Sequence, residues 1–130
     1  MKLSYVILYV KDVEASVTFY KQAFGLGHKF THEGGDYAEM DTGETTLAFC
    51  NHNLAESLFD GNYEQTSLKD KVSVSQITLA PEDIKQAYKK ALQAGAVSIS
   101  EPQIKPWNFE VASVRDIDGH AVELAKNLNE

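Results

Sequence analysis

The chain has 130 residues, of which 43% are hydrophobic and 24% are charged. This length suits a single domain spanning residues 1–130, and no stretch approaches the roughly 20 continuous apolar residues that a membrane helix requires. The formal net charge is −7, and Lys and Arg are scattered instead of gathered into a stripe. The composition therefore predicts a soluble domain whose partners are neither nucleic acid nor membrane.

The one cysteine, Cys50, excludes an internal disulfide, and we expect it to be a small apolar core residue. The N-terminus enters an alternating apolar pattern at Leu3, without the charged region, apolar block and cleavage site of a signal peptide. We therefore expect a cytoplasmic location.

The first half of the chain predicts a strand, a helix and three further strands. Residues 3–10 are apolar on both faces, which is typical of a central strand covered on both sides. Asp12 stands where an N-cap is expected, apolar residues follow at helical spacing, and Gly25 ends the helix. Three short strands separated by glycine-containing turns are expected near 27–33, 36–41 and 45–51.

The second half repeats this order after a polar segment, residues 52–71, which we interpret as a linker. A strand is expected from Val72 to Leu79, and Pro81 can occupy the first turn of a helix that Gly95 ends. Strands near 97–100, 109–115 and 120–125 follow, and Asp118-Gly119 is a hairpin signal between the last two.

The two halves match at an offset of 71 residues, which places Asp12 on Asp83 and Val13 on Ile84. The element order, the helix caps and the closing hairpin also match. These features predict a duplicated βαβββ module, with one copy at about 1–51 and the other at about 72–130.

The run from Tyr9 to Leu26 resembles the first helix of the vicinal-oxygen-chelate superfamily, which contains glyoxalases, bleomycin resistance proteins and extradiol dioxygenases. The run from Val114 to Leu124 resembles the closing hairpin of that superfamily. The resemblance implies an α+β fold in which two tandem βαβββ modules form a curved mixed β-sheet with a concave ligand cleft. It also implies a homodimer.

In glyoxalase-type members the resemblance further implies four metal ligands, one from the first and one from the last strand of each module. These positions fall on Tyr5, Ala48, Gln76 and Glu123 in this chain. Only Glu123 is a good ligand for a divalent metal. Neither first strand contains His, Asp or Glu, so a slip in register does not restore the set. We therefore expect no metal and no cofactor, with a divalent metal as the less favoured alternative.

The same four residues are expected near the centre of the cleft, with Phe49 and Trp107 as candidates for its rim. Trp107 either lines the cleft or packs one edge of the second module. Glu123 either faces an apolar cleft, where it needs a hydrogen-bond donor and can act as a general base, or lies solvated near the mouth.

These observations favour a metal-independent protein that binds a small organic molecule, similar to the bleomycin-resistance branch of the superfamily. The alternative is a metal-dependent glyoxalase-like lyase, in which a metal acts as a Lewis acid. A metal-free enzyme that uses Glu123 or Tyr5 for proton transfer and a partner-binding protein also remain open.

Overall fold

The computed structural model describes residues 1–130, which fold into two compact units with one four-stranded sheet each. The first unit contains residues Met1–Lys21 and Gly25–Thr66, and the second contains Gln22–Phe24 and Ser67–Glu130. None of the helices combines the length and the hydropathy needed to cross a lipid bilayer.

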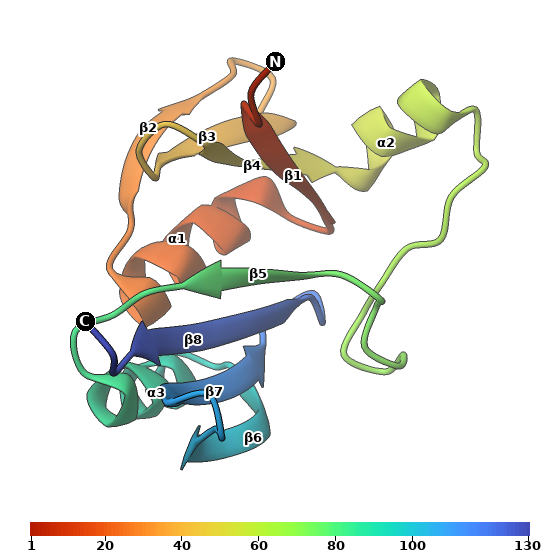
Figure 1. Cartoon of the computed structure of the whole chain (residues 1–130). Coiled ribbons are helices and arrows are strands. Elements are labelled where there is room, and N and C mark those ends of the chain that lie inside the picture. Colours follow the sequence, from red (N-terminus) through yellow and green to blue (C-terminus); the bar gives the residue numbers. More distant parts are fainter. The chain divides into compact units, whose positions relative to one another are not determined.

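The sheet of the first unit has the order β1-β4-β3-β2, in which β1 and β4 are parallel and the other pairs are antiparallel. Its strands are β1 (Tyr5–Val10), β2 (Gly27–Thr31), β3 (Tyr37–Asp41) and β4 (Thr46–Asn51). Helix α1 (Val13–Phe24) connects β1 to β2 and lies along one face of this sheet (Figure 1). The Tyr20 and Phe49 rings, whose centroids lie 4.9 Å apart, join the helix to β4.

The sheet of the second unit has the equivalent order β5-β8-β7-β6, again with one parallel pair, β5 and β8. Its strands are β5 (Gln76–Leu79), β6 (Val97–Ile104), β7 (Phe109–Arg115) and β8 (Ala121–Asn127). Helix α3 (Ile84–Gln93) contacts β6, β7 and β8, and buries Ile84 against Ala112 and Leu124. The expected α+β fold of two βαβββ modules is thus confirmed.

The internal repeat is also visible in the details of the two modules. Strands β1 and β5 begin at Tyr5 and Gln76, which differ by the 71 residues of the sequence offset. The carboxylates of Asp12 and Asp83 each accept a hydrogen bond of 3.0 Å from a backbone N–H in the first turn of the following helix. Both helices begin at a capped residue that follows a parallel strand, so the two crossovers have the same local construction. Strand β1 lies at the edge of its sheet, so the expectation of a central strand covered on both sides is wrong.

Two strand boundaries differ from the expectation. The predicted strand from Val72 begins only at Gln76, because its partner β8 starts at Ala121, opposite Gln76, and leaves the preceding residues nothing to pair with. Strand β6 extends to Ile104, beyond the predicted end near 100. It accommodates Pro102 because it is an edge strand with an irregular register between Ser100 and Gln103.

The polar segment after the first module is more structured than a plain linker. Residues His52–Phe59 form helix α2, whose N-cap is Asn51, the last residue of β4. The Asn51 side chain accepts a hydrogen bond of 3.0 Å from the backbone N–H of Leu54. Asp60 ends the helix in the left-handed conformation.

The β7–β8 hairpin of the second unit is tied to the turn at residues 67–70. Arg115 donates hydrogen bonds to the backbone carbonyls of Gly119, Asp70 and Ser67, at 2.9, 2.8 and 3.0 Å respectively. Gly119 has a φ of +91°, and a Cβ at this position would lie 2.6 Å from the Ser67 carbonyl oxygen. The hairpin therefore requires glycine both for its backbone conformation and for this close approach.

We predict that Gly119→Ala lowers the free energy of unfolding by about 3 kcal/mol, because a left-handed alanine costs about 1 kcal/mol and the contact with Ser67 adds an overpacking cost. Gly43→Ala is the matched control, because Gly43 has a φ of +90° but no atom within 4 Å of the added Cβ. Urea denaturation measures the free energy of unfolding of both variants. Equal losses in the two variants would contradict the role given to the Ser67 contact.

Candidate functional site

In each unit a helix covers one face of the sheet and leaves the other face without a helix of its module. Successive strand residues point to opposite faces, so the packing of Phe49 against α1 places Ala48 and Cys50 on the helix-free side. We call the helix-free face of the first sheet the Glu39 face. It includes Tyr5, Ile7, Tyr9, Phe30, Tyr37, Glu39, Ala48 and Cys50.

Glu39 is a buried carboxylate on this face, with a side chain only 9% exposed. Its Oε2 accepts a hydrogen bond of 2.7 Å from the Tyr37 hydroxyl, and its Oε1 lies 3.7 Å from the Lys29 ammonium. Lys29 reaches Glu39 from a register irregularity in β2, where the pairing shifts between His28 and Phe30. The carboxylate is therefore stabilised by one hydrogen bond and one partly exposed cation.

The residues around Glu39 form a partly exposed apolar surface. Tyr5 is 49% exposed, Ile7 39% and Phe30 43%. Ala48 lies between Ile7 and Glu39 in the strand register and is completely buried. The arrangement combines short side chains beneath taller ones with a buried carboxylate, and such a surface suits an organic ligand.

The pKa of the Tyr37 phenol reflects this environment. Burial first, and then the hydrogen bond and the negative charge of Glu39, raise the pKa of Tyr37 well above its ordinary value. Burial also raises the pKa of the Cys50 thiol, with a further contribution from Asp36. Both groups are therefore held in their neutral form on a face that carries a buried negative charge.

The helix-free face of the second sheet, which we call the Glu123 face, carries a group of polar side chains. It carries Gln76 and Thr78 from β5, Ser113 from β7 and Glu123 from β8. Thr78 Oγ1 donates to Glu123 Oε1 at 3.1 Å, and Gln76 Nε2 donates to Thr78 Oγ1 at 3.5 Å. Glu123 is half-buried, and its direct donor is thus Thr78, with Gln76 one step further along the chain of hydrogen bonds.

Phe49 and Trp107, the two residues expected at the rim, lie in different surroundings. Phe49 is completely buried beneath α1, on the face of the first sheet opposite Ala48, because adjacent strand residues alternate. Trp107 lies in the β6–β7 turn and is 61% exposed. The following Asn108 has a φ of +63°, a conformation that asparagine tolerates better than most residues.

The four residues at the implied ligand positions do not fit a divalent metal. Ala48 has no donor atom, Tyr5 has only a phenol oxygen, and Gln76 has only an amide carbonyl. No group of three or more His, Cys, Asp or Glu side chains comes together anywhere in the structure. Glu39 does lie beside Ala48 in the register, but both of its oxygens already have partners.

Sequence reasoning missed Glu39 and Thr78. Glu39 is the only charged residue in the middle of β3, between Ala38 and Met40, and a charge within an apolar strand is a signal that was available. Thr78 shares a face with Gln76 because the two are separated by one residue. In both cases the cross-strand register, which the sequence does not show, decides which side chains lie beside the residue.

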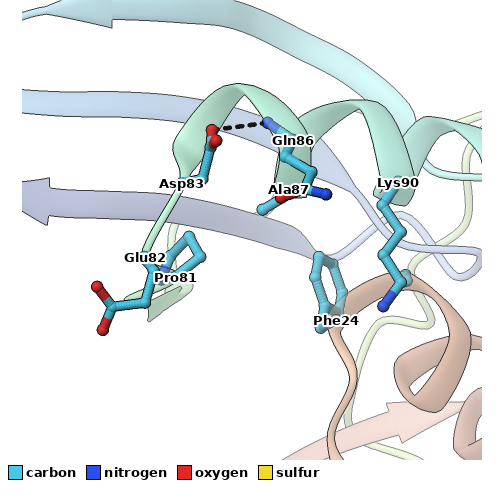
Figure 2. Close-up of a pocket in the computed structure, with 8 residues that line it drawn as sticks. Phe24, Pro81, Glu82, Asp83, Gln86, Ala87 and Lys90 are labelled. Carbon is cyan, nitrogen blue, oxygen red and sulfur yellow. Dashed lines mark hydrogen bonds between the residues drawn. The ribbon is translucent and has the colours of Figure 1, made fainter.

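A pocket of about 300 Å³ lies on the surface of the second unit, at the start of α3. Figure 2 shows Lys90 beside the Phe24 ring, and the Asp83 carboxylate directed to the backbone N–H of Gln86. Asp83 is thus occupied as a helix cap. None of the six residues expected at the ligand site lines this pocket, which is formed by Ala23, Phe24, Pro81, Glu82, Asp83, Gln86, Ala87 and Lys90.

We predict that Glu39→Gln lowers the pKa of Tyr37, because it removes the negative charge while keeping an acceptor for the hydroxyl. In the wild type, the raised pKa favours the neutral phenol in the folded state. Tyr37 therefore contributes stability that is present below about pH 10 and is lost as the pH rises above that value.

Absorbance at 295 nm, recorded during an alkaline titration, measures this pKa. Glu44→Gln is the matched control, because it removes the same charge from an exposed turn of the same unit. An unchanged titration curve in Glu39→Gln would show that Glu39 does not govern the Tyr37 phenol.

Comparison with known proteins identifies the family. Residues 2–124 match the model of the Glyoxalase/Bleomycin resistance protein/Dioxygenase superfamily. The uncharacterised protein YraH of Bacillus subtilis (strain 168) is 30% identical over 131 residues, which cover 98% of this chain and 100% of YraH.

Solved structures share the fold at lower sequence identity. A glyoxalase/bleomycin resistance protein/dioxygenase family enzyme from Burkholderia phytofirmans PsJN superposes with a TM-score of 0.84 at 20% identity, covering 98% of this chain and 100% of that one. TioX from Micromonospora sp. ML1 superposes with a TM-score of 0.72 at 21% identity, over the same shares. With the family match over nearly its whole length, the chain belongs to the Glyoxalase/Bleomycin resistance protein/Dioxygenase superfamily.

Proposed function

We propose that this protein binds a small organic molecule on a helix-free face of one of its sheets, without a metal and as a homodimer. The observation that carries the proposal is the Glu39 face, where partly exposed Tyr5, Ile7 and Phe30 surround a buried carboxylate. Exposed apolar surface is costly in water unless something covers it, and a ligand with an apolar body would do so.

The Glu123 face offers a second, separate surface for such a ligand. Glu123, Thr78 and Gln76 form a chain of hydrogen bonds on a sheet face that carries no other carboxylate. Such a set can orient a polar group of a ligand through directional hydrogen bonds. The Glu123 carboxylate can also transfer a proton, a role that requires no metal.

The absence of a metal in the proposal rests on the chemistry of the donor residues. A tight divalent site requires several carboxylate, imidazole or thiolate ligands, and the implied positions offer one carboxylate, an amide, a phenol and a methyl group. We also propose a cytoplasmic location, which suits a single buried thiol.

We predict that protein purified without an affinity tag contains far less than one equivalent of divalent metal. Elemental analysis measures the metal content, and melting curves with and without EDTA test whether any bound ion stabilises the fold. A stoichiometric ion, with a large fall in melting temperature after chelation, would overturn the metal-independent proposal in favour of a glyoxalase-like lyase.

We predict that a screen of planar cationic drugs and thiol conjugates finds ligands that raise the melting temperature, and that Glu123→Gln weakens the binding of any polar hit about tenfold, which corresponds to one hydrogen bond to a charged group. Glu101→Gln is the control, because Glu101 is exposed on β6 of the same unit. Unchanged affinities for all hits in Glu123→Gln would remove Glu123 from the site.

The proposed homodimer is tested separately by sedimentation equilibrium. A monomer at micromolar concentration would overturn this part of the proposal and leave ligand binding to be judged by the screen.

A further inference from the structure

Helix α2 and the turn after it carry an aromatic cluster that touches the Glu39 face. The Tyr9 and Phe59 rings meet edge to face with centroids 5.4 Å apart, and Tyr63 lies 6.4 Å from Tyr9 and 5.8 Å from Phe59. Tyr9 belongs to the same face as Ile7 and Tyr5, because the three alternate along β1. The cluster therefore stands at one end of the Glu39 face.

Local hydrogen bonds hold this segment in place. The Tyr63 hydroxyl donates to the His52 carbonyl at 3.1 Å, and the His52 and Tyr63 rings stack with centroids 5.9 Å apart. The Asn51 cap joins the start of α2 directly to the end of β4. Hydrogen bonds at both ends of the segment thus hold the aromatic rings in position.

A second aromatic pair lies across the face. Phe30 and Tyr37 have ring centroids 6.1 Å apart, and Tyr37 lies in the same register row as Cys50 and Tyr9. Tyr9 and Tyr37 are therefore two strand spacings apart, about 10 Å between their Cα atoms. Only the short side chain of Cys50 stands between them in this row.

Phe59 differs from its neighbour on the same helix. Phe59 is 42% exposed although its ring contacts both Tyr9 and Tyr63, whereas Leu58 is 60% exposed and makes none of these ring contacts. A partly exposed ring that is already fixed by two others loses little entropy when it contacts a ligand, and aromatic pairs prefer edge-to-face or offset geometry.

We infer that Phe59 and Tyr63 form one wall of the ligand site on the Glu39 face and select ligands that carry a flat aromatic ring. The inference rests on the proposed ligand-binding function and names its ligand class and two residues that determine specificity. The segment between the modules is then part of the site, and its aromatic content sets which ligands bind.

The test compares 2-naphthol with its saturated counterpart decahydro-2-naphthol, which have the same carbon skeleton and the same hydroxyl group. Dissociation constants are measured by calorimetry for the wild type and for Phe59→Leu, which keeps an apolar side chain but removes the ring. Leu58→Ala is the matched control on the same helix, and melting curves confirm that each variant is folded.

The expected result is tighter binding of 2-naphthol than of decahydro-2-naphthol by the wild type, a preference that falls about three- to tenfold in Phe59→Leu and is unchanged in Leu58→Ala. Equal binding of the two probes by the wild type, or a preference retained in Phe59→Leu, would overturn the inference and leave the proposed function intact. Binding of neither probe also overturns the inference, while the wider ligand screen judges the proposed function independently.

Discussion

The covering of one sheet face by a crossover helix is the constraint on which the rest of this structure depends. In the first unit α1 packs on Phe49, and in the second α3 packs on Leu124 and Ala112. Because side chains alternate along a strand, the position of the helix assigns every strand residue either to the covered face or to the opposite face. The helix-free faces consist of the strand residues that the helices do not cover.

The two modules have kept this construction and have diverged on the helix-free side. Their strand orders, helix caps and parallel pairs correspond, since all of these are required to fold the module. The Glu39 face has become aromatic and apolar around a buried carboxylate, whereas the Glu123 face presents hydroxyl and amide groups around a half-buried one.

The carboxylates also show how the residues at the implied ligand positions differ from a metal-binding set. The last strand of the first module has Ala48 at the position where a ligand is implied, and the carboxylate next to it comes from β3 as Glu39. Its oxygens are bound to Tyr37 and Lys29, which makes it part of the protein's own hydrogen-bond network. A carboxylate in this state is better suited to shaping the electrostatic environment of an organic ligand than to coordinating an ion.

The sequence by itself determined the elements whose signals are local. Asp12 and Asp83 mark the helix starts because a carboxylate caps free backbone N–H groups, and Gly119 marks the last hairpin because few other residues adopt a positive φ. The tertiary structure decided what depends on cross-strand register and on contacts distant in sequence. Glu39 lies beside Ala48 because β3 pairs with β4, and Phe49 lies on the core face because strand residues alternate. The polar segment at 52–59 is a helix that Asn51 caps and whose end packs against Tyr9. Such long-range pairings carry no local pattern, so composition and spacing alone do not reveal them.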